Sequence, residues 1–372
     1  MHLLELFLRN FRNYRRAEVR LERGINVFVG HNAQGKSNLL EAVYLCATGR
    51  SHRTQRDEEM IRAGEDRAVV RCRAAGGLGE ETLEVRLGRE DGEPVAKEFR
   101  VNGMEVERGE LLGRLPVILS SPLDLDIIRG AAGARRRFLD GMLSQLSPAY
   151  YFTLLRYARV LQQRNRLLRQ GHAGGMEAWD EQMVALGTVL AARRHAAVTR
   201  LAPRATRIYG EIVGGREELV LTYRPVWEGS GEEEISAAGR RALAAVRALE
   251  RQRGTSLSGP HRDDLTVVAG GMELRAFGSQ GQQRAAALAG RLAEWELLRE
   301  DRGEDPVLLL DDVLAELDDR RQAYLLDRVA RGAQALLTTT AVRETAVPLP
   351  AIRRFWVVSG TVEETAGDVR TP

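Results

Sequence analysis

A glycine-rich turn near the N-terminus carries the residues with the clearest chemistry. The segment "GHNAQGKS", residues 30–37, matches the pattern G-x-x-x-x-G-K-[ST] and lies between a short apolar run and a stretch with helical periodicity. In a P-loop of this kind, backbone N–H groups cradle phosphates, a lysine reaches the β and γ phosphates, and a hydroxyl ligates Mg²⁺. Those last two roles fall to Lys36 and Ser37. The other loop residues that would line the phosphates are Gly30, His31, Asn32, Ala33, Gln34 and Gly35.

The composition of the chain supports this interpretation of Lys36. Among 372 residues, only Lys36 and Lys97 are lysines, against 53 arginines. Nearly every position that needs only positive charge has therefore received arginine. A P-loop needs the compact ammonium group of lysine, because a planar guanidinium would not fit the loop. The alternative is a glycine turn with a surface lysine.

A second candidate site follows the apolar run in "PVLLLDDV", residues 306–313. Four apolar residues predict a buried strand, and a carboxylate at its end suits the Mg²⁺ of a P-loop ATPase. Asp311 is the candidate for the metal shell. Asp312 is the candidate for the carboxylate that polarises the attacking water. The alternative is a strand that ends in a polar turn. The long separation between Lys36 and Asp311 predicts a large insertion.

Three later stretches add candidate phosphate contacts. In "FGSQGQQR", residues 277–284, Ser279 and Gly281 lie at a loop that opens a predicted helix, and helix N-termini bind anions. The stretch "LAELDDR", residues 314–320, follows the carboxylate strand, and "ALLTTT", residues 335–340, predicts a strand that ends in hydroxyls. Each stretch has a simpler explanation, namely a serine helix cap, a polar helix start or a threonine-rich strand.

The order of these motifs resembles that of the ABC-type ATPase heads of the SMC group, and more narrowly that of the RecF family of bacterial recombination mediators. The resemblance runs nearly end to end. It departs from the family at His31 and Ser37, where an acid and a threonine are frequent, and at Ala131 and Ala134, where a proline is common. The strings that carry the narrower match are "NFRNY" at 10–14, "GHNAQGKSNLLEAVYL" at 30–45, "SHRT" at 51–54, "SPLDLDIIRG" at 121–130, "RRRFLD" at 135–140, "LQQRNRLLR" at 161–169, "SGPHRDDL" at 258–265, "GSQGQQR" at 278–284 and "LLLDDVLAELD" at 308–318.

This resemblance implies an α/β fold, in which an ABC/SMC-type P-loop ATPase head contains an inserted, mainly helical lid domain. We expect the N-terminal part of the ATPase domain over residues 1–120, the lid over 121–255 and the C-terminal part over 256–372. The implied ligands are ATP and Mg²⁺, with Lys36 and Asp312 as the catalytic residues. Ser37 and Asp311 would hold the metal.

The resemblance also implies a homodimer that forms on ATP. In such heads the S-x-G-x-x-R loop of one subunit faces the γ-phosphate bound by the P-loop of another, so the nucleotide adds its contact energy to the dimer. This contact in trans is assigned to Ser279, Gly281 and Gln282, and the loop at the dimer face to Asp318. Thr339 and Thr340 fall where ABC heads keep a switch-loop histidine.

Two further positions bear on nucleotide chemistry. Arg12, on the loop after the first predicted strand, would approach the nucleotide in similar heads, and the alternative is a solvated hairpin arginine. Asp312 is one methylene shorter than the glutamate of transporter ATPases. We therefore expect a weak, DNA-stimulated ATPase, in which slow hydrolysis acts as a switch.

The resemblance implies a role in recombinational gap repair and replication restart. The ATP-bound dimer would bind double-stranded and gapped DNA and, with RecO and RecR, help to load RecA. Arginine contacts to phosphates would carry no sequence preference. One alternative is the cytoplasmic ATPase subunit of a transporter, which the size and basicity of the insertion disfavour. Another is a small-molecule phosphotransferase, which the second phosphate-binding loop disfavours.

The insertion predicts a compact helical lid, because no heptad pattern is sustained over residues 121–255. Ser147 and Pro148 form a typical helix start, and Gly171 a typical end. The residues that trace one face of this helix are Leu154, Leu155, Ala158, Leu161, Asn165 and Leu168.

A second helix is predicted from about Met176 past Arg207, with an interruption at Pro203. The stretch "ELVLTYRPVW" predicts a strand between helices. Between residues 135 and 207 the sequence has 13 arginines and four acids, which favours a polyanion partner. An arginine-rich composition that only covers solvated helix faces is the alternative. The candidate DNA contacts are Arg135, Arg136, Arg164, Arg166, Arg193 and Arg194.

The remaining features set limits on location and ligands. The net charge is +3, and neither a signal peptide nor an apolar run long enough for a membrane span is recognisable, so we expect a cytoplasmic protein without a membrane partner. Cys46 and Cys72 are expected to be core residues in a reducing compartment. His261 lies in a turn-forming stretch, so we expect no metal other than Mg²⁺.

Overall fold

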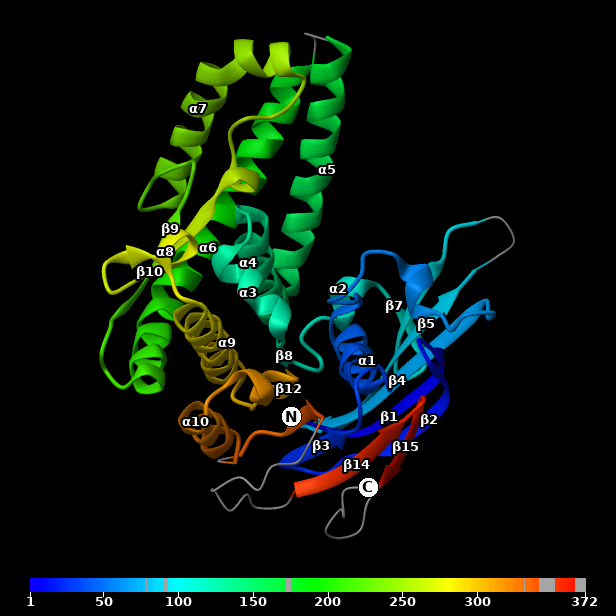
Figure 1. The fold of residues 1–372 in the computed structure, drawn as a ribbon. Helices are drawn as coiled ribbons and strands as arrows, with labels where there is room; N and C mark the ends of the chain where they lie inside the picture. Colours follow the sequence, from blue (N-terminus) through cyan, green and yellow to red (C-terminus); the bar gives the residue numbers. More distant parts are fainter. Residues whose placement is uncertain (78, 90–92, 172–174, 331, 341–351, 365–372) are drawn as a thin grey trace. The chain divides into compact units, whose positions relative to one another are not determined.

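The computed structural model describes residues 1–77, 79–89, 93–171, 175–330, 332–340 and 352–364. The chain forms two compact units (Figure 1), which we call the head unit (Met1–Leu123 and Glu294–Pro372) and the helical unit (Asp124–Ala293). The α/β class with a mainly helical insertion is confirmed. The helical unit extends to Ala293, beyond residue 255 where the sequence placed the end of the lid, and it therefore contains Ser279.

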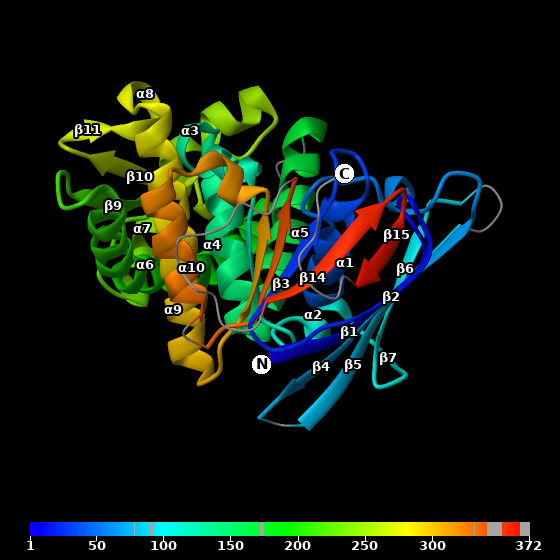
Figure 2. The same cartoon turned by 60° about the horizontal axis from the view of Figure 1, so that its bottom comes forward.

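The first sheet of the head unit is mainly parallel and contains the strand that precedes the P-loop. Strand β3 pairs in parallel with β13 on one side and β14 on the other, as Figure 2 shows. Strands β3, β8, β12 and β13 are buried along their whole length, as their mainly apolar sequences predict for a sheet covered on both faces. In sheet order, the strands are β15 (Thr361–Glu364), β14 (Ile352–Val358), β3 (Ile25–Val29), β13 (Ala335–Thr339), β12 (Val307–Asp311) and β8 (Val117–Ser120).

The second sheet of the head unit is antiparallel and has one buried face. Leu6 and Leu8 of β1 point into the core, whereas Phe7 and Arg9 lie on the opposite face, as the two-residue period of a strand requires. In sheet order, the strands are β2 (Tyr14–Arg20), β1 (His2–Phe11), β4 (Arg67–Gly76), β5 (Gly79–Gly88), β6 (Ala96–Val101) and β7 (Met104–Val106).

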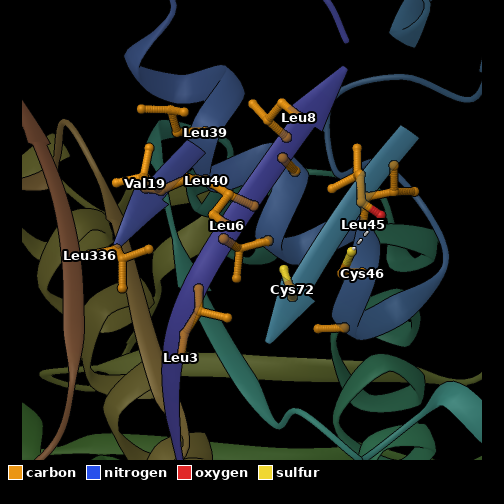
Figure 3. Packing of buried hydrophobic residues seen from close by; sticks show 14 of the residues in the cluster. Leu3, Leu6, Leu8, Val19, Leu39, Leu40, Leu45, Cys46, Cys72 and Leu336 are labelled. Atoms are coloured by element: carbon orange, nitrogen blue, oxygen red, sulfur yellow. Dashed lines mark hydrogen bonds between the residues drawn. The ribbon is translucent and has the colours of Figure 1, made fainter. Parts of the chain in front are cut away.

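The core of the head unit forms around helix α1 (Lys36–Thr48), which contacts strands of both sheets. Leu39 and Leu40 of this helix are fully buried together with Leu6 of β1, and Figure 3 shows this packing. Cys46 and Cys72 are free thiols inside the same core, which confirms the prediction of core cysteines. Burial of each such leucine contributes about 1.5–3 kcal/mol, so this packing fixes the position of α1.

The helical unit consists of long helices and one small antiparallel sheet. The sheet order is β11-β10-β9, which confirms a strand in "ELVLTYRPVW". Its elements are α3 (Leu125–Arg129), α4 (Ala132–Leu146), α5 (Pro148–Gln170), α6 (Met176–Val213), β9 (Leu219–Arg224), α7 (Glu232–Arg253), β10 (Asp264–Ala269), β11 (Met272–Glu273), α8 (Leu274–Phe277) and α9 (Gln280–Arg302), the last of which ends in the head unit. The remaining elements of the chain are the helices α2 (Arg108–Leu111) and α10 (Asp319–Ala330) and the short 3₁₀ turns η1 (Asp57–Met60), η2 (Pro122–Asp124), η3 (Pro260–Arg262) and η4 (Val313–Glu316).

Helix α5 has the predicted ends but buries only part of the predicted face. The Ser147 hydroxyl accepts a hydrogen bond from the backbone N–H of Tyr150, and Gly171 ends the helix in a left-handed conformation with φ 69°. Only part of the predicted face is buried: Leu168 is buried, the leucines at 154, 155 and 161 are partly buried, and Ala158 is exposed. The other residues that the helix buries are Tyr150, Tyr151, Tyr157, Val160 and Arg164.

Helix α6 continues through Pro203, so the predicted interruption is wrong. Proline in a helix removes one backbone hydrogen bond and costs about 3 kcal/mol. Leu201 and Ala205 flank it and are fully buried, and packing of these turns outweighs the cost. Among the described residues, no helix combines the length and the apolar character needed to cross a bilayer.

Candidate nucleotide and nucleic-acid sites

The predicted P-loop lies between β3 and α1, where two glycines are required by their surroundings. Gly35 has φ 116°, a region that favours glycine, and a Cβ there would lie 2.7 Å from Asn13 Nδ2. A Cβ at Gly30 would lie 2.3 Å from the carbonyl oxygen of Val357. Larger residues at either position would displace the loop.

The side chain of Lys36 is folded back into this loop. Its Nζ donates to the carbonyl oxygens of Gly30 at 2.7 Å and His31 at 2.8 Å. Burial lowers the pKa of Lys36, and the negative charges of Asp312 and Asp311 oppose that shift. An ammonium group has three donors, so one remains for a phosphate oxygen.

A hydroxyl and a carboxylate meet beside Lys36, as a Mg²⁺ site requires. The Ser37 hydroxyl donates to Asp311 Oδ1 at 2.8 Å, although the two residues are 274 positions apart. Thr338 donates to the same oxygen at 2.8 Å, and its hydroxyl accepts from the backbone N–H of Asp312 at 2.9 Å. Oxygen ligands of this kind fit Mg²⁺. No sequence pattern distinguishes Thr338 from the two threonines that follow it.

Asp312 is held in an unusual conformation with an unpaired oxygen. Its φ is 57°, and its Oδ1 is buried without a hydrogen-bond partner among the described residues. A buried carboxylate oxygen is costly unless something pairs with it, so this atom fits the predicted contact with a water or ligand. Nearby, the carbonyl oxygen of Thr339 accepts from the N–H of Gly30 at 3.3 Å, which ties the end of β13 to the loop.

Arg12 forms a buried ion pair with the P-loop helix. Its Nε and Nη2 donate to the two oxygens of Glu41 at 2.9 and 2.6 Å, and Ser51 donates to the same carboxylate. Burial raises the pKa of Glu41, but the hydrogen bonds from Arg12 and Ser51 outweigh it and hold that pKa below its ordinary value. Arg12 is thus not a freely solvated hairpin arginine, because Glu41 binds it. The sequence analysis did not predict a role for Glu41. An acid among the apolar residues of α1 could have indicated a buried ion pair.

Segments from both ends of the chain fasten the P-loop at Gln34. Its carbonyl oxygen accepts from Asn13 Nδ2 at 2.8 Å and from the N–H of Gly360 at 3.2 Å. Its side-chain oxygen accepts from the N–H of Ser359 at 2.7 Å. The turn between β14 and β15 therefore contributes to the shape of the phosphate-binding loop.

In the helical unit, Ser279 and Gln282 cap helix α9 reciprocally. The hydroxyl of Ser279 accepts from the N–H of Gln282 at 3.3 Å, and the Gln282 side chain accepts from the N–H of Ser279 at 2.9 Å. Gln282 also donates to both oxygens of Glu217, at 3.0 and 2.8 Å, a contact that the sequence did not indicate. Ser279 is exposed, and Gly281 is partly exposed between these residues.

Asp318 precedes helix α10 in the head unit and is exposed. Its Oδ1 accepts from the N–H of Arg321 at 2.9 Å, so locally it acts as a helix cap. The side chain still faces solvent, where a second subunit could reach it.

Comparison with known proteins identifies the family. A profile described as "RecF/RecN/SMC N terminal domain" matches residues 2–348. A protein of Symbiobacterium thermophilum described as "DNA replication and repair protein RecF" is 43% identical over 97% of this chain and 98% of its own length. The chain belongs to the RecF family of DNA replication and repair proteins.

Solved structures agree with this RecF assignment. The structure described as the recombination mediator protein RecF with ATP in the RecFOR pathway is 33% identical, covers 98% of both chains and superposes with a TM-score of 0.90. A protein of Geobacillus thermodenitrificans with the same RecF description is 40% identical over 92% of this chain and 93% of its own. The Smc head of Pyrococcus furiosus covers 98% of this chain and 96% of its own at 16% identity and a TM-score of 0.58, and it shares the fold. The predicted SMC-type head is confirmed.

Three of the arginines predicted to contact DNA are internal to this RecF-family structure. The Arg164 side chain is 1% exposed and donates to Asp180 at 2.7 Å, Glu250 at 2.6 Å and Ser256 at 2.7 Å. Arg194 binds both oxygens of Asp140, at 2.9 and 3.0 Å.

Arg135 binds both oxygens of Asp264, at 2.6 and 3.0 Å, and is as buried as Arg194. A buried guanidinium with these partners has no donors to offer a phosphate, so the predicted DNA contacts at Arg135, Arg164 and Arg194 are corrected. The two carboxylates that follow His261 in the sequence are also paired with arginines. Asp263 binds Arg194, and Asp264 binds Arg135.

The other three candidates differ among themselves. Arg136 is partly buried and donates to the carbonyl oxygen of Asp263 at 2.6 Å. Arg166 and Arg193 are exposed, and neither has an ion-pair partner in the part of the chain that the structure describes. Of the six candidates, Arg166 and Arg193 are thus the two whose guanidinium groups have no partner among the described residues.

Proposed function

We propose that this RecF-family chain is an ATP-switched DNA-binding protein of recombinational gap repair and replication restart. The observation that carries the proposal is the hydrogen bond between Ser37 and Asp311, which joins the P-loop to the carboxylate strand beside Lys36. The descriptions of its relatives as DNA replication and repair proteins, and of a RecF structure with ATP in the RecFOR pathway, support it. RecO and RecR are the partners that this pathway implies, and loading of RecA is the outcome we expect.

The loop from Gly30 to Ser37 would hold the phosphates of ATP, with the remaining Lys36 donor on a terminal oxygen. Ser37 and Asp311 would hold Mg²⁺, which neutralises charge on the phosphates when it is bound. Asp312 would orient the attacking water through its unpaired oxygen. Because an aspartate reaches less far than a glutamate, we expect slow hydrolysis that DNA stimulates and that serves as a switch.

We further propose that ATP is completed by a second copy of the chain. Ser279, Gly281 and Gln282 of that copy would contact the γ-phosphate. Ser279 is exposed and the other two are partly exposed, which supports this assignment. Asp318 and Thr339 would lie at the same junction. A ligand that binds only the paired state stabilises the dimer by mass action, and hydrolysis withdraws that stabilisation.

The test is size-exclusion chromatography with and without ATP, using two variants. Gly281→Asp places a negative charge where the γ-phosphate would approach, so it should abolish ATP-dependent pairing while leaving ATP binding by the monomer intact. Lys36→Ala should weaken ATP binding itself and thereby pairing. Pairing that survives in Gly281→Asp would show that this loop does not complete the site. Failure of the wild-type chain to bind ATP would overturn the whole proposal.

A further inference from the structure

Helix α5 has a solvent face that is almost entirely arginine and glutamine. The helix spans Pro148–Gln170 and contains five arginines but no aspartate or glutamate. From Arg156 to its end, every exposed residue except Ala158 is one of these two types. The exposed residues in this stretch are Arg156, Ala158, Arg159, Gln162, Gln163, Arg166, Arg169 and Gln170.

The four exposed arginines form a stripe along one side of the helix. Arg156, Arg159, Arg166 and Arg169 follow one another at spacings of three, seven and three residues, which keeps them on one face. At 1.5 Å per residue the stripe is about 20 Å long. None of the four has a hydrogen-bond or ion-pair partner among the described residues, whereas Arg164 on the opposite side has three.

An arginine-rich surface on the head unit differs from the stripe in its pairing. On the antiparallel sheet of the head unit, arginines surround a cavity of about 570 Å³. There Arg71 and Arg86 both bind Glu84 at 2.6 Å, and Arg73 binds Glu5 and Glu80. Carboxylates of the same sheet thus already neutralise these arginines. The α5 stripe presents charge that nothing in the described structure compensates.

We propose that the exposed arginine stripe of α5 contacts the phosphate backbone of double-stranded DNA. This inference rests on the proposed function and assigns a surface to it. A duplex carries one charge per about 1.7 Å, so about 20 Å of it presents more phosphates than the stripe has arginines. The glutamine amides between the arginines can donate to phosphate oxygens as well.

The chemistry of the stripe favours duplex DNA over other polyanions. Single strands are held by stacking of bases on aromatic side chains, and none of the exposed residues between Arg156 and Gln170 is aromatic. Membrane surfaces and protein interfaces need large apolar anchors, and no large apolar side chain of α5 is exposed. Because contacts to phosphates do not read bases, the stripe should bind without sequence preference.

The test is fluorescence anisotropy with a labelled duplex, with ATP, over a series of salt concentrations. The variant replaces all four stripe arginines by glutamine, as Arg156→Gln, Arg159→Gln, Arg166→Gln and Arg169→Gln. Log K falls as log salt rises, and loss of four contacts should reduce the magnitude of this slope by about 3–4. Binding near 0.1 M salt should weaken by on the order of 100-fold or more. ATP binding and far-ultraviolet circular dichroism should not change.

Two controls separate stripe contacts from net charge. Replacement of the same four positions by lysine should keep the slope, because lysine also binds phosphates. A matched variant removes four exposed arginines from α7 of the same unit, as Arg240→Gln, Arg241→Gln, Arg251→Gln and Arg253→Gln. This variant has the same net charge and should keep most of the slope. An equal loss in both glutamine variants would overturn the assignment to α5.

The outcomes also separate this inference from the proposed function. If the wild-type chain binds duplex DNA with a steep salt dependence and the α5 variant binds equally, the stripe assignment alone is wrong. If the wild-type chain binds no duplex in any nucleotide state, both fail. Should the fourfold variant not fold, each single replacement must lower the slope by about one, and four unchanged slopes would overturn the inference.

Discussion

Arg164 and Arg166 stand two residues apart on α5 and occupy opposite environments. The first is buried and binds two carboxylates and a hydroxyl, and the second is exposed and unpaired among the described residues. The same contrast holds for the interior set Arg135, Arg164 and Arg194 against the α5 stripe. An arginine-rich segment can thus serve two purposes, because the position on the helix decides whether each guanidinium joins elements of the fold or faces solvent.

The interior set joins elements that the hydrophobic core alone would leave unspecified. Arg164 of α5 binds Asp180 of α6 and Glu250 of α7 and thereby fixes three helices to one another. Burial of charges is expensive, so such a group contributes more to the uniqueness of the packing than to net stability. Loss of one member leaves its partners buried and unpaired, which is where the largest effects are expected.

The largest effect should come from Arg164→Met. The substitution keeps much of the side-chain volume but leaves the carboxylates of Asp180 and Glu250 without their buried partner, so we expect a loss of about 3–5 kcal/mol in the free energy of unfolding. Urea denaturation monitored by circular dichroism would measure it. A loss below about 1 kcal/mol would show that the fold depends on Arg164 no more than on the exposed arginines of the α5 stripe.

A pH effect should follow from His261, which lies close to the interior arginines. Burial lowers its pKa to about 4, and the positive charges of Arg262 and Arg164 act in the same direction. The unfolded chain protonates near pH 6.5, so it binds more protons than the fold between pH 6.5 and 4, and stability falls as the pH drops through this window. We expect a loss of about 2 kcal/mol between pH 7 and 5. His261→Gln should remove most of that difference in urea denaturation.

A smaller loss is expected for Arg135→Gln. Its partner Asp264 is 36% exposed, so water can solvate the carboxylate once the guanidinium is gone. We expect a decrease of about 1–2 kcal/mol in the free energy of unfolding, below that of Arg164→Met. The same denaturation experiment checks the order, and a larger effect at Arg135 than at Arg164 would contradict the role given to burial.

The smallest effect on stability should come from Arg166→Gln, which changes an exposed side chain without a partner. We expect the free energy of unfolding to change by less than about 0.5 kcal/mol. The slope of duplex binding against salt should nevertheless fall by about one. A stability loss comparable to that of Arg164→Met would erase the distinction between the two sets.

Local signals predicted the ends of elements better than their faces. Ser147, Pro148 and Gly171 determine where α5 begins and ends, because capping depends on adjacent residues. The face predicted for this helix is only partly the buried one, since the helix buries Leu168 together with tyrosines and Arg164 but exposes Ala158. No local pattern shows that an arginine will be buried when its partners lie 16 to 92 residues away.

In the proposed nucleotide site, too, local patterns were predictable and contacts between distant elements were not. The pattern from Gly30 to Ser37 and the apolar run before Asp311 are local, and the fold brings them together. Thr338 and Glu41 were missed because their contacts depend on the alignment of neighbouring elements. Strand register decides that Thr338, rather than Thr339, faces Asp311.

The pairing of β3 has a consequence for the synthesis of the protein. Both neighbours of this strand, β13 and β14, are encoded about 300 residues after it. At roughly 5–20 residues per second, a ribosome needs about 15–60 s to supply them. Throughout that interval β3 lacks both of its neighbours in the parallel sheet. We therefore expect the proposed nucleotide site at Lys36 to be completed only after β14 has been synthesised.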